Sequence, residues 1–64
     1  MKQYLIQFTI VYHGGVTKDD DFTIYAETIR RALEKADKRL SAIRYGTGSV
    51  VTITAIREIK KEEL

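Results

Sequence analysis

The sequence contains no cysteine, a single histidine and no long apolar run, and each absence narrows what the chain can be. Without cysteine, neither a disulfide nor a thiolate zinc site can stabilise the fold. No segment approaches the roughly 20 consecutive apolar residues that a membrane-spanning helix needs. The N-terminus lacks the basic-then-apolar pattern of a secretion signal, so we expect a cytoplasmic protein without a membrane partner.

Groups that support catalysis or metal binding are equally scarce. His13 ends a strand-like pattern beside two glycines and has no histidine, cysteine or serine near it in the sequence. This favours a surface histidine over a catalytic base or a metal ligand. The run Asp19, Asp20 and Asp21 lacks the ligand spacing of a calcium loop, which predicts a solvated acidic turn or a docking site for a basic partner. We therefore expect no enzyme, no cofactor, no metal and no small-molecule substrate.

The chain has 64 residues, of which 44% are apolar and 31% charged, and its net charge is +2. This composition predicts a folded chain with one domain over 1–64. A domain of this size buries only about 60% of the surface that its unfolded chain exposes. Because small domains without disulfides or metals often gain stability by association, we expect a homodimer.

Alternating apolar and polar residues predict two strands, over 3–13 and 21–27. Gly14 and Gly15, followed by the polar residues through Asp21, predict a loop between these strands. The first strand is the longer and more apolar of the two. One of its faces carries Tyr4, Ile6, Phe8, Ile10 and Tyr12.

The period then changes to the spacing of a helix, predicted over 28–44. Thr28 is the expected N-cap and Gly46 the expected left-handed residue at the C-terminal end. The glycines in Gly46–Ser49 follow a helix and precede a strand, the reverse of a phosphate-binding loop, so we interpret them as a turn. A third strand over 49–59, with a bulge before Ile59, and a frayed tail over 60–64 complete the chain.

The element order is ββαβ, an α+β fold. The first two strands form an antiparallel hairpin, and the helix returns the chain so that the third strand runs parallel to the second. A right-handed crossover then gives a three-stranded sheet of order 2-1-3. One helix covers only one face of such a sheet. The other face is a candidate protein-binding or dimer surface with Leu5, Gln7, Thr9, Val11, Tyr25, Val50 and Thr52, accompanied by Thr23, Thr54 and Ile56.

Three interpretations of this uncovered face remain open. It is a solvated, threonine-rich face, a surface for self-association, or a surface for a different protein. Four of its residues could join into one apolar patch large enough to imply a partner: Leu5, Val11, Tyr25 and Val50.

The helix carries basic residues opposite its apolar arc. Arg31, Lys35, Lys38 and Arg39 are candidate nucleic-acid-binding residues, because a basic stripe attracts phosphates. The stripe is short, has no interleaved aromatic residue and shares the helix with two acidic residues. A solvated helix face is the alternative interpretation.

The segment Phe22–Thr28 followed by Ala32–Ala36 resembles small accessory proteins of phages and mobile elements, in which a strand ends in Ala-Glu-Ser/Thr before an alanine-spaced helix. The layout, with the closing segment Ile53–Ile59, is also similar to archaeal ribosomal protein LX. This chain has Gly46–Ser49 where the ribosomal protein has a dense basic stretch. The first resemblance implies a small non-enzymatic protein-binding or regulatory module, an inhibitor that occludes a host protein in the host cytoplasm. The alternative is a nucleic-acid-binding module.

Overall fold

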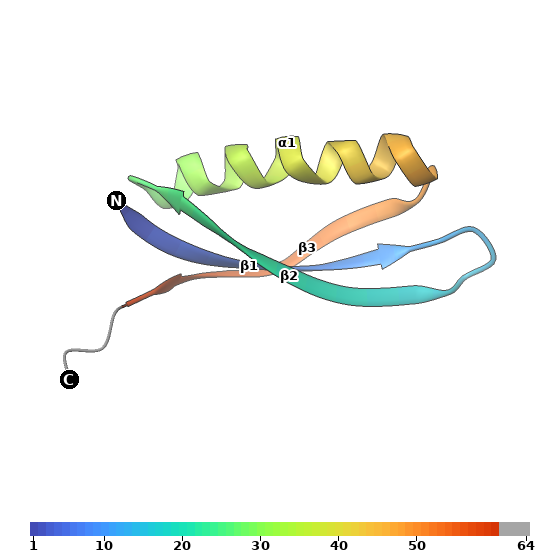
Figure 1. The fold of residues 1–64 in the computed structure, drawn as a ribbon. Helices are drawn as coiled ribbons and strands as arrows, with labels where there is room; N and C mark the ends of the chain where they lie inside the picture. The colour runs from blue at the N-terminus through green and yellow to red at the C-terminus, as the bar shows by residue number, and fades with distance from the viewer. Residues whose placement is uncertain (61–64) are drawn as a thin grey trace.

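The computed structural model describes residues 1–60 and has the element order β1, β2, α1, β3 (Figure 1). The sheet order is β2-β1-β3, and β1 is antiparallel to both neighbours, so β2 and β3 run parallel to each other. This confirms the predicted ββαβ α+β fold and strand order. The tail predicted over 60–64 lies outside the described residues apart from Lys60. The elements are β1 (Lys2–Val11), β2 (Thr17–Ala26), α1 (Ile29–Thr47) and β3 (Val50–Ile59).

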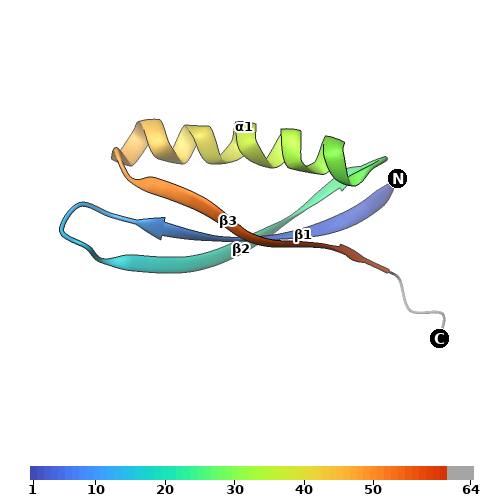
Figure 2. The ribbon, with the colours of Figure 1, turned by 180° about the vertical axis from the view of Figure 1, so that it is seen from behind.

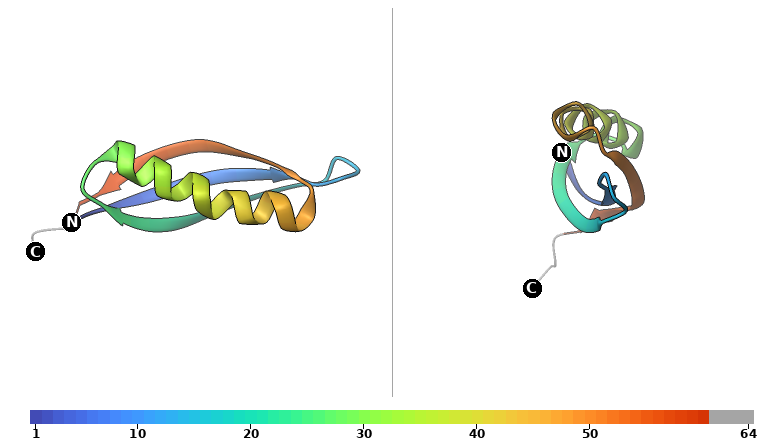
Figure 3. Two further views of the ribbon diagram at one scale, coloured as in Figure 1. Left: turned by 90° about the horizontal axis from the view of Figure 1, so that it is seen from above. Right: turned by 90° about the vertical axis from the view of Figure 1, so that its right-hand side faces the viewer.

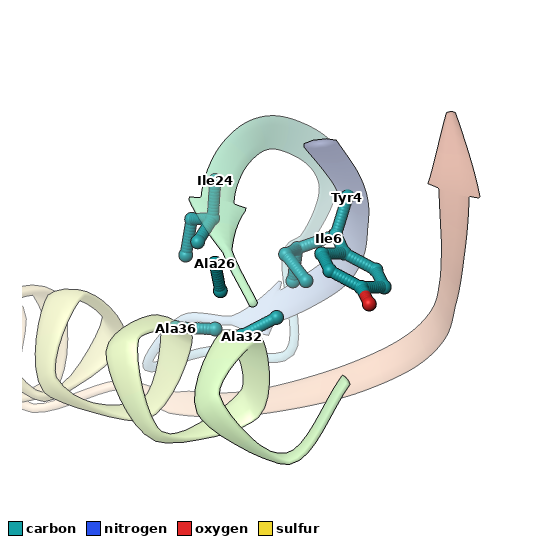
Figure 4. Packing of buried hydrophobic residues seen from close by; sticks show 6 residues of the cluster. All are labelled: Tyr4, Ile6, Ile24, Ala26, Ala32 and Ala36. Atoms are coloured by element: carbon teal, nitrogen blue, oxygen red, sulfur yellow. The ribbon is translucent and has the colours of Figure 1, made fainter. Parts of the chain in front are cut away.

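The helix lies along one face of the twisted sheet, and no described residue covers the opposite face (Figures 1 and 2). The covered face of β1 carries Tyr4, Ile6, Phe8 and Ile10, all buried as the alternation predicts. Ala32 and Ala36 oppose them from α1 and let the helix approach the sheet closely (Figure 4). Leu40, fully buried, completes the core toward the C-terminal end of the helix.

The second strand begins earlier than the sequence predicts, and this corrects the assignment of the acidic loop. The register pairs Val11 with Thr17, so the connection is only the five residues from Tyr12 to Val16. Tyr12 N donates to Val16 O at 2.8 Å, and both glycines of the loop have positive φ. Asp19, Asp20 and Asp21 therefore lie in β2, not in a turn. Pairing with the long β1 overrides the poor strand propensity of aspartate.

The helix also extends further than predicted. Thr28 is the N-cap, accepting a hydrogen bond from Arg31 N at 3.2 Å. The helix continues through Gly46 to Thr47, and the left-handed C-cap is Gly48 (φ 66°), whose N donates to Arg44 O at 2.8 Å. The prediction that Gly46 is the left-handed residue at the end of the helix was wrong. That residue is Gly48, the next glycine along the chain.

A bulge interrupts the pairing of β3 with β1, at Thr54 rather than beside Ile59. Gln7 pairs with Ala55 and the next residue, Phe8, pairs with Ile53, which leaves Thr54 as the extra residue. Its Oγ1 donates to Gln7 O at 3.2 Å. Beyond the bulge, the side chains of β3 that point to each face are offset by one residue. Ile56 therefore pairs with Ile6 on the covered face and does not belong to the uncovered face, where it was predicted.

The two glycines near the end of α1 give a matched test of this helix terminus. Gly48→Ala is expected to lower the free energy of unfolding by about 1–2 kcal/mol, because a Cβ disfavours the left-handed conformation. Gly46→Ala is expected to raise it by about 0.5–1 kcal/mol, since Gly46 is helical and nothing lies within 4 Å of an added Cβ. Urea denaturation of both variants measures the difference. Equal changes in the free energy of unfolding for the two variants would mean that Gly48 is not the C-cap of α1.

Candidate functional site

The uncovered side of the sheet, which we call the open face, is built by the alternation of β1. Leu5, Gln7, Thr9 and Val11 alternate with the core residues and so point away from α1. The register adds their cross-strand neighbours on the same face. From β2 these are Thr17, Asp19, Asp21, Thr23 and Tyr25; from β3 they are Val50, Thr52, Ala55, Arg57 and Ile59.

The centre of the open face is polar and acidic. Asp21 lies opposite Gln7, and Asp19 lies opposite Thr9, whose Oγ1 donates to Asp19 Oδ1 at 2.6 Å. These residues, with Thr54, line a shallow hollow across the three strands. Asp20 points to the other side of β2, where its carboxylate lies 3.9 Å from Lys18 Nζ. Because successive strand residues alternate between faces, Asp19 and Asp21 lie on the open face and Asp20 does not.

The apolar residues of the open face are separated into two groups by this acidic centre. Leu5 lies near Tyr25 at one end, and Val11 pairs with Val50 at the other. Leu5 and Val11 are six residue steps apart on β1, which is about 20 Å of strand. The predicted single apolar patch is therefore wrong, because Leu5 and Val11 lie toward opposite ends of one strand and the antiparallel hairpin places Tyr25 at the Leu5 end. Tyr25 and Val50 are the most exposed of the four, at 57% and 63%.

The basic residues of α1 are largely held by contacts within the domain. Arg31 Nη1 lies 3.7 Å from Glu34 Oε1, and Lys35 Nζ donates to Tyr25 O at 2.7 Å. The Arg39 guanidinium carbon lies 4.4 Å from the centre of the Phe22 ring, a cation–π contact. Within residues 1–60 the Lys38 ammonium makes no hydrogen bond or ion pair. The predicted stripe thus does not present four free cations.

An exposed aromatic residue on the same helix face was missed in the sequence. Tyr45 is 91% exposed. It follows Lys38 by seven residues, which places the two side chains about 20° apart around the helix axis. The spacing could have revealed it, but the helix was predicted to end before this residue. The outer face of α1 therefore does combine a cation with an aromatic ring.

Within residues 1–60, no group of three or more His, Cys, Asp or Glu side chains is arranged to hold a metal ion. His13 is exposed in the β1–β2 connection, and its Nε2 lies near Gly48 at the end of α1. In the same part of the chain, no helix has the length and apolar character needed to cross a membrane.

Fold and surface together define a small ββαβ domain with one open sheet face. No protein-family model matches the chain, and neither a curated protein nor a solved structure does.

Proposed function

We propose that this chain is a non-enzymatic protein-binding module that acts as a phage-type inhibitor, occluding a host protein in the cytoplasm through its open face. The observation that carries the proposal is the composition of this face. It spans all three strands, is covered by no described residue, and places two carboxylates between two apolar groups. Apolar contacts at both ends would supply affinity, and the carboxylates would select the partner.

The acidic centre of the open face defines the kind of partner, and Arg57 lies at one end of the face, opposite Leu5. Asp19 and Asp21 stand two residues apart on one strand, and Gln7 and Thr9 beside them offer further polar groups. Such a surface complements lysine or arginine side chains and repels phosphates. The proposed partner is therefore a protein with a basic patch flanked by apolar residues.

Affinity capture from a host lysate at low salt tests the proposal. The wild-type chain is expected to retain one stoichiometric protein. A variant with reversed charge on the open face, Asp19→Lys with Asp21→Lys, is expected not to retain this protein. A variant with reversed charge on the helix, Arg31→Glu with Lys38→Glu, changes exposed residues outside the open face. It is expected to retain the captured protein. Capture of no protein, or loss only with the helix variant, would contradict the proposal.

Binding of nucleic acid through α1 is the second candidate, favoured by the exposed Tyr45, which lies on the same side of the helix as Lys38 and about two turns from it. An aromatic ring on the same helix face as a cation can stack on an unpaired base while the cation contacts phosphate. Titration of labelled single-stranded RNA and DNA at about 50 and 200 mM salt tests it, because several phosphate contacts make affinity fall by orders of magnitude across this interval. Since three of the four basic residues have intramolecular contacts, we expect weak binding or none. Tight, salt-sensitive binding abolished by Tyr45→Ala would establish this function instead.

A further inference from the structure

The two outer strands of the sheet differ in how their free edges are protected. Each is hydrogen-bonded only to β1 in the described sheet, so each has one unpaired edge. Charged residues discourage an edge strand from pairing with another chain. The middle of β2 carries four charged residues in succession, Lys18 to Asp21, whereas β3 has none from Val50 to Ile56. Only β3 presents a long β-branched segment without charged side chains of its own, although Arg44 from α1 donates to one of its carbonyls, Val51 O.

We propose that β3 pairs antiparallel with β3 of a second copy, joining two three-stranded sheets into one continuous sheet with two-fold symmetry. The proposal concerns a strand edge and leaves the open face of each copy free. It therefore does not depend on the proposed function. In the dimer the two open faces would lie side by side and form one larger surface.

The bulge in β3 selects the register of this pairing. Residues directly opposite in an antiparallel pair point to the same face of the sheet. Because Thr54 is an extra residue, the facing pattern of β3 is symmetric about the Thr54–Ala55 bond. Thr52 and Arg57 both face the open side, as their β1 neighbours Thr9 and Leu5 do. The matching pairs between the two copies are 50 with 59, 51 with 58, 52 with 57 and 53 with 56.

This register places no like charges opposite each other. Arg57 of one copy lies opposite Thr52 of the other, and Glu58 lies opposite Val51. The Val51 carbonyl accepts from Arg44 Nη2 at 3.3 Å, so the guanidinium stands beside this position. That guanidinium is already 3.5 Å from Asp37 Oδ1 through its Nη1. Glu58 of the second copy would approach it on the covered side and share it with Asp37. Pairing of two β2 edges would instead bring carboxylates together.

Exposed apolar side chains of α1 lie on the flank that the second copy would cover. Leu33 precedes Arg44 by eleven residues, which places the two about 20° apart around the helix axis. Because Arg44 reaches β3 while Lys35 and Arg39 reach β2, Leu33 lies on the β3 flank. Leu33 and Ile29, one turn earlier, are 38% and 49% exposed. In Figure 3 the N-terminal half of the helix lies toward the C-terminal half of β3.

A narrow interface of this kind predicts moderate affinity. The ladder satisfies main-chain groups of β3, and the helix flank adds apolar area to it. Specific interfaces below about 1,200 Å² of total buried surface belong to weak, reversible complexes. We therefore expect a dimer that dissociates on dilution through the micromolar range.

Two substitutions of opposite charge at Thr52 test both the interface and its register. Thr52 is exposed on the open face, and within residues 1–60 its side chain makes no hydrogen bond. Thr52→Glu would create two contacts with Arg57 across the two-fold axis, and Thr52→Arg would create two repulsions. The dissociation constant is expected to fall by roughly 2- to 30-fold for the first and to rise by a similar factor for the second. Sedimentation equilibrium measures both.

Thr23 supplies the matched control, because it is exposed on the same face but lies on β2, opposite Leu5. Thr23→Glu and Thr23→Arg are expected to leave the dissociation constant unchanged. A second readout uses the absence of cysteine: Thr52→Cys mixed with Arg57→Cys should give a disulfide-linked heterodimer that neither variant forms alone. A monomer at millimolar concentration, or a dimer indifferent to charge at Thr52, would overturn the proposal.

Discussion

Replacing Leu40 with alanine is expected to lower the free energy of unfolding by about 2–5 kcal/mol. Leu40 is fully buried between α1 and the sheet, and Ala36, the core position one turn earlier on the helix, is too small to fill the cavity. A 64-residue domain has a total stability of about 3–10 kcal/mol. The variant should therefore be partly or wholly unfolded at 25 °C, as measured by urea denaturation followed by circular dichroism.

Leu33→Ala is the matched control for this prediction. It makes the same chemical change on the same helix, but at a side chain that is already partly exposed. Measured at concentrations where the chain is monomeric, it is expected to cost about 1 kcal/mol or less. Equal losses for the two variants would mean that α1 does not pack on the sheet through Leu40.

Reversing the open-face carboxylates, with Asp19→Lys and Asp21→Lys, is expected to weaken partner binding at least about 100-fold. Each reversal removes an attraction and sets two cations against each other at the centre of the interface, and such juxtapositions cost several kcal/mol. Both residues are exposed, so the fold should persist. Titration calorimetry with the captured protein measures the change.

The neutral variant Asp19→Asn with Asp21→Asn separates charge from shape. It preserves the size and much of the hydrogen bonding of the two side chains, so its loss should be much smaller than that of the lysine variant. Raising the salt concentration should weaken wild-type binding more than binding of the neutral variant. An affinity unchanged in the lysine variant would mean that the partner does not contact the open face.

The architecture was predictable because local and long-range signals agree. The alternation in β1 and the three-and-four spacing in α1 each specify one buried face. Order 2-1-3 then follows from the handedness of the crossover. Prediction from local sequence failed where two residues could play the same role. Gly46 and Gly48 are both able to end the helix, and only the backbone shows that Gly48 has the positive φ.

The candidate surface was predictable in its residues but not in its pattern. Periodicity places Leu5, Gln7, Thr9 and Val11 on one face, as the structure confirms. The acidic centre was missed because aspartate disfavours strands, so the pairing of Asp19 and Asp21 with β1 could not be anticipated. The contact of Arg39 with Phe22 likewise depends on tertiary packing, which the sequence pattern does not specify.

The central claim, that the open face is the binding surface, is tested most directly by mapping the contact on the chain itself. Backbone amide NMR spectra of the labelled chain, recorded while the captured protein is added, report every residue at once. The account predicts the largest shifts at open-facing positions of the three strands, centred on Gln7 and Asp21, with little change along the outer face of α1. Shifts concentrated around Lys38 and Tyr45, with the strands unaffected, would contradict it.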